Sequence, residues 1–80
     1  MKIAICIRKE VEVNHPVFEK ILKGEKEYFQ RGIPNPITKA EIEQAADIVE
    51  ELAGFKFATL AEEDTVHVYD VDSDLALLEL

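Results

Sequence analysis

Residues 38–54, TKAEIEQAADIVEELAG, give the clearest structural signal in the chain. Thr38 and Glu41 form the T-x-x-E pattern of a capping box, in which a hydroxyl and a carboxylate satisfy backbone donors at a helix start. From Ile42 onward, apolar residues recur at i, i+3, i+4, i+7, i+10 and i+11, and Gly54 is a typical helix end. The stretch therefore predicts an amphipathic helix over residues 39–53.

A strand is predicted at the beginning of the chain. Residues 3–7, IAICI, are all apolar, with isoleucine at every second position and a smaller apolar residue between. A period of two is typical of a strand, and apolar residues on both faces indicate a central strand covered on each side. We therefore expect a strand over residues 2–8. Glu and Val alternate over residues 10–13, so the strand either extends to residue 13 or folds back near residues 8–9.

A second helix is predicted between this strand and the main helix. Asn14 or His15 can cap it, because the proline that follows fits the first helical turn, where its missing N–H costs no hydrogen bond. Apolar residues at helical spacing come next, and Gly24 is a good C-terminal stop, which gives a helix over residues 16–23. Residues 25–33 fit either a strand or a further helical turn, and both alternatives stay open.

The remaining elements lie after the main helix. Residues 55–60 and 65–71 are rich in aromatic and β-branched residues, and residues 61–64 have the length and polarity of a hairpin turn. The apolar segment Leu75–Leu80 is expected to pack on the core or on another copy of the protein. The order β-α-(?)-α-β-β predicts one α+β domain, residues 1–80, in which a small antiparallel or mixed sheet of three or four strands packs against two helices.

Cysteine use and hydropathy bear on the location of the protein. Cys6 is the single cysteine and lies in an apolar run, so we expect a buried thiol and a reducing interior. Met1 and Lys2 are followed by only five apolar residues before Arg8, too few for a secretory leader or a membrane span. We therefore expect a cytoplasmic protein without membrane contact.

Charge is divided unevenly along the 80 residues, whose formal net charge is −8. Residues 1–39 hold eight Lys and Arg against five Asp and Glu, whereas residues 40–80 hold twelve Asp and Glu against Lys56 alone. Net charge governs solubility and the choice of partner rather than the fold, so the acidic half indicates a basic partner or none.

Four carboxylates of the main helix lie opposite its apolar stripe, roughly 5–6 Å apart along the axis, a length scale similar to that of phosphates along a DNA strand. A merely solvated helix face is the alternative, but such a face normally mixes both signs, and no Lys or Arg lies between Lys39 and Lys56. Glu62, Glu63 and Asp64 form the predicted hairpin tip. After it, Asp70, Asp72 and Asp74 occupy every second position. The candidate partner-binding residues are Glu43, Asp47, Glu50, Glu51, Glu62, Glu63, Asp64, Asp70, Asp72 and Asp74.

Metal and catalytic motifs are incomplete. The repeat Asp70-x-Asp72-x-Asp74 matches the opening of a calcium loop, but Leu75 replaces the glycine that such a loop needs. One cysteine and two separated histidines offer no zinc-ligand spacing. His67 has no nucleophile at a recognisable spacing, and the only serine lacks the G-x-S-x-G pattern. We therefore expect no metal, no cofactor and no enzymatic activity.

Three hypotheses for function follow. The leading one is a small acidic, non-catalytic binding protein that engages a basic site on another protein. The most specific form of this hypothesis is a nucleic-acid mimic that inhibits a DNA- or RNA-handling protein. Anti-restriction and anti-CRISPR proteins of phages and mobile elements act in this way. The second is a structural or assembly subunit that forms a homodimer or larger homo-oligomer through Leu75–Leu80 and a sheet edge. The third is a small enzyme, which a pocket gathering His67, Asp70 and Tyr28 would support.

Direct nucleic-acid binding is disfavoured. Basic residues of the first half lie near Tyr28 and Phe29, a combination that can bind single strands. Five acids are interleaved with these residues, however, and the whole chain is strongly negative.

Overall fold

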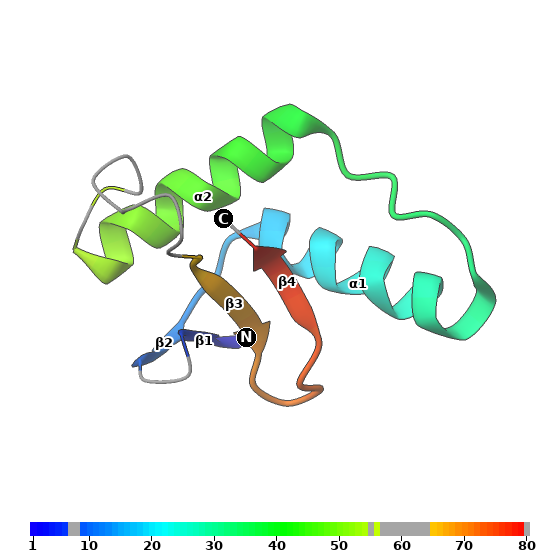
Figure 1. Ribbon diagram of the computed structural model, residues 1–80, viewed down its shortest axis with the longest axis horizontal. Coiled ribbons are helices and arrows are strands. Elements are labelled where there is room, and N and C mark those ends of the chain that lie inside the picture. Colours follow the sequence, from blue (N-terminus) through cyan, green and yellow to red (C-terminus); the bar gives the residue numbers. More distant parts are fainter. Residues whose placement is uncertain (7–8, 55, 57–64, 80) are drawn as a thin grey trace.

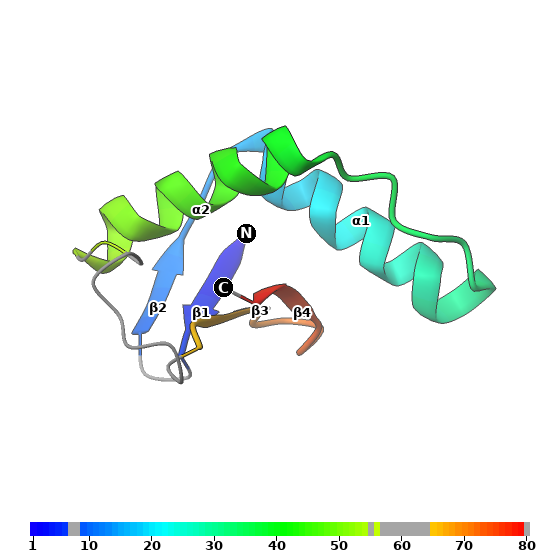
Figure 2. The same cartoon turned by 45° about the horizontal axis from the view of Figure 1, so that its top comes forward.

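The computed structural model describes residues 1–6, 9–54, 56 and 65–79. In chain order its elements are β1 (Lys2–Ile5), β2 (Lys9–Glu12), α1 (Pro16–Arg31), α2 (Lys39–Ala53), β3 (His67–Asp70) and β4 (Ala76–Glu79). The four strands form one antiparallel sheet in the order β2-β1-β3-β4. Both helices lie on the same side of this sheet (Figures 1 and 2). The predicted α+β class, with a small sheet packed against two helices, is confirmed.

The first strand is shorter than predicted. The chain reverses between Ile5 and Lys9 and returns as β2, in which Val11 pairs with Ile3. The continuous strand expected over residues 2–8 is therefore wrong, and the fold-back is the alternative that the structure adopts. Glu10 and Glu12 are exposed on β2, which is an edge strand, because alternating charge and valine suits a strand with one wet face.

The prediction of a central strand is half right. β1 lies between β2 and β3 in the sheet, but the helices cover only one of its faces. Cys6 follows β1 with a positive φ of 54° and is exposed, so the expected buried thiol is wrong. The residue ends a strand at a chain reversal instead of continuing into the core.

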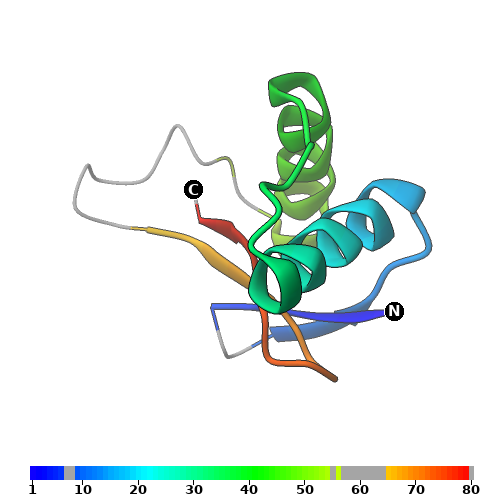
Figure 3. The ribbon, with the colours of Figure 1, turned by 90° about the vertical axis from the view of Figure 1, so that its right-hand side faces the viewer.

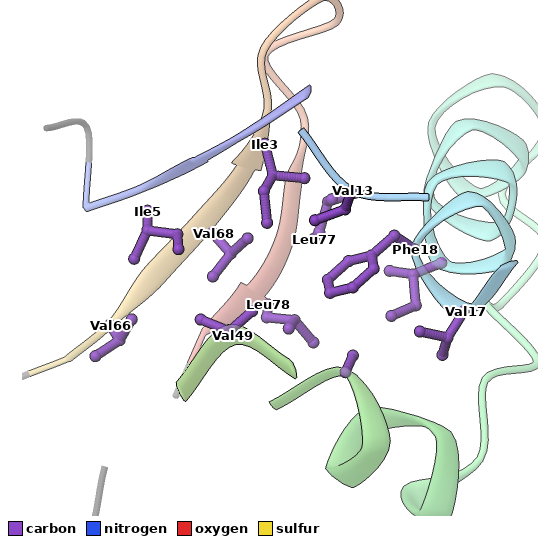
Figure 4. Packing of buried hydrophobic residues seen from close by; sticks show 12 residues of the cluster. Ile3, Ile5, Val13, Val17, Phe18, Val49, Val66, Val68, Leu77 and Leu78 are labelled. Atoms are coloured by element: carbon purple, nitrogen blue, oxygen red, sulfur yellow. The ribbon is translucent and has the colours of Figure 1, made fainter. Parts of the chain in front are cut away.

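The hydrophobic core fills the space between the sheet and the helices (Figure 4). Phe18 of α1 and Val49 of α2 point toward the inward residues of β1 and β3, and all of these side chains are buried. The buried apolar residues are Ile3, Ile5, Val13, Val17, Phe18, Ile21, Ala45, Val49, Val66, Val68, Leu77 and Leu78. Apolar burial of this kind contributes about 25 cal/mol per Å² removed from water and is the main favourable term in folding.

Helix α1 continues through Gly24 and ends at Arg31, so the predicted stop at residue 23 is wrong and residues 25–31 are helical. His15 caps its start, with the ring Nδ1 accepting a hydrogen bond from the backbone N–H of Val17 at 3.1 Å. Gly32, at φ 68°, ends the helix instead, because its backbone N–H donates to the carbonyl of Tyr28.

Gly24 is required for close packing rather than for a helix end. Asn35, in the connection to α2, lies directly over it, and a Cβ at position 24 would stand 2.0 Å from the Asn35 Oδ1 atom. The Asn35 amide donates to the Ile21 carbonyl at 3.3 Å and to the Glu25 carboxylate at 3.1 Å, and its Oδ1 accepts from the Ile37 N–H at 3.3 Å. These three hydrogen bonds fix the connection against α1.

We expect Gly24→Ala to destabilise the protein by about 1–3 kcal/mol, because Asn35 must give up partly buried hydrogen bonds to make room. In an Asn35→Ala background the same substitution should become neutral or stabilising, by up to about 1 kcal/mol, since alanine favours helix over glycine. Urea unfolding of the four proteins measures both effects. Stabilisation of the wild-type background by Gly24→Ala would contradict this account of the contact.

Helix α2 spans the 15 residues predicted for it. Both halves of the capping box are present: the Thr38 hydroxyl accepts from the Glu41 N–H at 3.2 Å, and the Glu41 carboxylate accepts from the Thr38 N–H at 3.2 Å. Gly54, at φ 83°, closes the helix.

The C-terminal segment forms the fourth strand. β4 pairs with β3, and Leu77 and Leu78 are both buried because a bulge in the pairing turns consecutive residues inward. The expectation that this segment packs on the core is confirmed. A hairpin was predicted in which strands over residues 55–60 and 65–71 are joined by a turn over residues 61–64. Apart from residue 56, its first strand and its turn lie outside the described residues. In the described chain, the second strand contains β3, which pairs with β1 and β4.

The connection from β3 to β4 is a turn organised by Asp70. Its side chain is 2% exposed, and its Oδ2 accepts from the Ser73 N–H at 3.0 Å and from the Ser73 hydroxyl at 2.5 Å. Its backbone carbonyl accepts from the Asp74 N–H at 2.8 Å, and Asp74 has a φ of 64°. The strand therefore ends at Asp70, and Asp72 and Asp74 lie in the turn that follows and not on a strand face.

Asp70→Ala should lower the free energy of unfolding by about 1–3 kcal/mol, because the Ser73 donors lose their buried acceptor. Asp72→Ala removes an exposed carboxylate from the same turn and should change stability by less than about 0.5 kcal/mol. Urea unfolding of both variants gives the comparison. Equal losses in the two variants would show that the Asp70 carboxylate does not organise the turn.

Candidate functional site

The outer face of α2 displays four carboxylates, which we call the α2 acid row: Glu43, Asp47, Glu50 and Glu51. At 100° per residue these positions lie opposite the buried Ala45 and Val49. Glu43, Asp47 and Glu51 are exposed, and Glu50 is partly buried. The sequence prediction that these residues share one solvent-facing side is therefore confirmed.

Basic residues of the first half approach α2 but contact it at its two ends. Lys20 of α1 pairs with Glu41 in the first turn, with 2.6 Å between Nζ and Oε2. Lys9 of β2 donates to the backbone carbonyl of Leu52 at 2.7 Å, which suits the negative end of the helix dipole. Among the residues that the structure describes, no ion pair within 4.0 Å involves Glu43, Asp47 or Glu51.

One cation lies beside the row. Lys56 lines a shallow pocket with Asp47, Glu50 and Glu51 at the C-terminal end of α2. This end of the row is therefore less negative than the sequence count implies. Glu43, at the N-terminal end of the row, is exposed and does not line this pocket.

The other predicted partner-binding residues do not join this row. Asp70 is buried within its turn, so its carboxylate is not available at the surface. Asp72 and Asp74 are exposed in the β3–β4 turn, which lies at the opposite end of the molecule from α2 (Figure 1). Glu62, Glu63 and Asp64 lie outside the described residues. The structure thus brings together four of the ten predicted acids on one face.

Glu41 shows how a carboxylate on α2 is neutralised. The hydrogen bond from Lys20 lowers the pKa of Glu41 below its ordinary value of 4.5, and the Thr38 backbone N–H and hydroxyl lower it further. Lys20 thereby removes Glu41 from the exposed negative surface, and the α2 acid row begins two residues later, at Glu43.

Because the pKa of Glu41 is lower in the folded protein than in the unfolded chain, its contribution to stability is complete above pH 4.5 and is lost as pH falls through the folded-state value. Lys20→Met should raise the pKa of Glu41 toward 4.5 and flatten this part of the stability profile. Carboxyl NMR titration and urea unfolding at several pH values measure the two effects. Lys23→Met is the matched control, since Lys23 has no hydrogen bond to Glu41; an unchanged pKa in Lys20→Met would refute the assignment.

The groups considered for catalysis do not converge. Val68 and Asp70 face the helices, so His67 and Tyr69, at the alternate positions of β3, face the opposite side of the sheet. There the two rings stack with 6.1 Å between their centroids, and the His67 Nδ1 lies 3.8 Å from the Glu79 carboxylate. Tyr28 is exposed on α1. His67, Asp70 and Tyr28 therefore do not form the pocket that an enzyme hypothesis would need.

In the described chain, no group of three or more His, Cys, Asp or Glu side chains is placed to hold a metal ion. None of the described helices is both long and apolar enough to cross a bilayer.

Exposed aromatic residues lie on the part of α1 beyond its predicted end. Tyr28 and Phe29 of α1 are 52% and 67% exposed, Ile33 is 47% exposed, and the two rings pack edge to face. The sequence signal was present, because Phe29 follows Phe18 by eleven residues and so continues the apolar stripe of α1. A helix predicted to end at residue 23 concealed that continuation.

Comparisons with known proteins return no relative. The chain matches no protein-family model, no curated protein and no solved structure at a significant level.

Proposed function

We propose that this protein is a small acidic, non-catalytic binding protein whose α2 acid row engages a basic site on another protein. The observation that supports this most is the exposure of Glu43, Asp47 and Glu51 on the face opposite the core, without an ion pair to any described residue. Like charges so arranged reduce helix stability by a few tenths of a kcal/mol per adjacent pair. Binding to a cationic partner is a reason for such a surface to be retained.

The sharper form of the proposal is nucleic-acid mimicry. Eight residues separate Glu43 from Glu51, which corresponds to about 12 Å along the helix axis at 1.5 Å per residue. Phosphates along one DNA strand rise by about 3.4 Å each, so the row spans the rise of about three or four phosphates. The partner is then the basic site of a DNA- or RNA-handling protein, and the inhibitor is of the anti-restriction or anti-CRISPR type found in phages and mobile elements.

The described geometry sets the size of this footprint. The row covers about two turns of one helix, and Asp72 and Asp74, the other described acids of the predicted set that are exposed, lie in the β3–β4 turn on the opposite side of the molecule. The proposed contact is therefore one short stretch of a basic groove rather than an extended duplex-binding surface. Electrostatic steering gives such a contact a fast association rate that falls as salt increases.

The test compares two triple variants with the same change in net charge. Glu43→Gln/Asp47→Asn/Glu51→Gln neutralises the row, whereas Glu10→Gln/Asp72→Asn/Asp74→Asn neutralises exposed acids elsewhere. Wild-type protein and both variants serve as bait in host lysate at low and high salt, with bound proteins identified by mass spectrometry. We expect the row variant to capture at least tenfold less of a nucleic-acid-binding partner than wild type does. A tenfold loss of affinity corresponds to about 1.4 kcal/mol of binding free energy.

The control variant should retain that partner, and added duplex DNA or RNA should displace it from the wild-type bait. Equal capture by the two variants would show that only net charge matters and would refute the α2 acid row as the binding site. Capture that is indifferent to salt, or partners without a nucleic-acid site, would refute mimicry.

A further inference from the structure

Backbone groups of β4 face an open edge of the sheet. β4 is the last strand in the sheet order, and in the described chain it pairs only with β3. The carbonyl of His67 in β3 accepts from the Cys6 N–H at 2.8 Å, so the backbone groups of His67 point toward β1. Glu79 lies opposite His67 in β4 and therefore directs its own N–H and C=O away from β3, toward the open edge. Such groups can pair with an extended segment of another chain.

Helix α1 lies over this edge and leaves a groove beside it. Figure 3 shows α1 crossing the strand layer on the helical side of the sheet, and the helix packs against β4. Glu25 of α1 lines a hollow of about 200 Å³ with residues 76–79 of β4. A second hollow of about 140 Å³ also has Glu25 and Leu77 in its lining. The apolar side chains of Ile37, in the connection, and Ile42, of α2, line this second hollow as well. Because the two hollows share residues they adjoin, and we call them together the β4 groove.

A carboxylate without a counter-charge lies in the β4 groove. Glu25 is partly buried, and its Oε1 accepts a hydrogen bond from the Asn35 amide at 3.1 Å. An amide carries no net charge, and in the described chain no ion pair within 4.0 Å involves Glu25. Glu79, which also lies 3.8 Å from the His67 Nδ1, adds a second carboxylate to a lining that includes no Lys or Arg of the described chain. Because a cation stabilises a partly buried carboxylate, the groove favours a positively charged occupant.

The composition of the chain argues against a second copy in this groove. Pairing of two β4 strands would bring residues 76–79 of one copy to the groove of the other, and this segment holds no Lys or Arg. It would instead add another Glu79 to a groove that already contains two carboxylates. Residues 57–75 hold no Lys or Arg either, so the chain before β4 supplies no cation. Charge complementarity therefore selects a basic segment of a different protein.

We propose that the β4 groove binds an extended basic segment of a partner protein, which pairs with the open edge of β4 and places a Lys or Arg side chain beside Glu25. Alternate side chains of the added strand face the groove. A residue two positions from the base therefore reaches the apolar part of the lining, where Ile42 is 38% exposed. We expect Val, Ile or Leu at that position of the partner. The contact uses none of the four carboxylates of the α2 acid row.

Selection from a displayed library of random short peptides tests the β4 groove. The full chain serves as bait, and the library is first depleted on the Glu25→Gln variant, so that the retained peptides need the Glu25 charge. Glutamine keeps an oxygen that accepts from the Asn35 amide, so this variant preserves the connection to α2. We expect the retained peptides to carry a Lys or Arg two positions from Val, Ile or Leu. The best of them should bind the Glu25→Gln variant at least tenfold more weakly than wild type.

Two control variants separate the groove from net charge, and circular dichroism checks that every variant is folded. Glu19→Gln removes an exposed acid of the same helix outside both hollows and should leave the dissociation constant of the selected peptide unchanged. The triple variant of the α2 acid row should also bind the peptide as wild type does at physiological salt, where distant exposed charges are screened, so the two proposals can fail separately. Amide hydrogen exchange at Glu79 should slow when the peptide is bound, and exchange in the other edge strand, β2, should not.

A library that yields no peptide dependent on Glu25 overturns the proposal, as do retained peptides without Lys or Arg. Equal weakening in Glu19→Gln or in the row variant assigns the binding to net charge and also overturns it, as does slowed exchange at another element in place of β4. Sedimentation of the chain without peptide examines the other occupant. Concentration-dependent association that slows exchange at Glu79 would assign the open edge to a second copy and would overturn the proposal as well.

Discussion

Phe18 is fully buried between the sheet and the two helices, and the rest of the molecule is arranged around this one apolar layer. A chain of 80 residues has enough apolar surface for a single core. Because that core occupies one face of the sheet, α1 and α2 must lie side by side on it. The outer face of α2 is then held toward solvent on a helix that the core and a capping box make rigid.

The same constraint distributes the charges. Lysines from the first half reach α2 only where α1 and β2 lie next to it, and they contact Glu41 and the Leu52 carbonyl at the two ends of the helix. On the outer face, the cation of Lys56 lines a shallow pocket with Asp47, Glu50 and Glu51, and no ion pair within 4.0 Å in the described chain involves Glu43, Asp47 or Glu51. Glu43, Asp47 and Glu51 therefore stay exposed without an ion pair in the described chain, whereas Glu41 of the same helix is paired with Lys20 and the described acids outside α2 are attached to other elements.

Polar groups at the connections decide where the elements end. Asn35 folds the α1–α2 connection onto Gly24, and Asp70 binds Ser73 to form the turn before β4. The sequence pattern suggested other roles for Gly24 and Asp70. Gly24 was interpreted as a helix end, and Asp70 as one of three acids in a partner-binding surface. The role of a glycine in close helix packing can be recognised only when the residue that packs over it is known. A carboxylate can be recognised as buried only when the groups that donate hydrogen bonds to it are known.

The sequence by itself determined helix α2, its caps and its acidic outer face, because helical periodicity and the capping box are local and need no distant contact. It also determined the α+β class, since strand and helix patterns alternate with periods of two and 3.6. Only the tertiary structure decided that β2 folds back on β1, that α1 runs eight residues beyond its predicted end, and that Asp70 turns inward. Each of these depends on a partner remote in sequence or on the register between strands, and residue spacing contains no record of either.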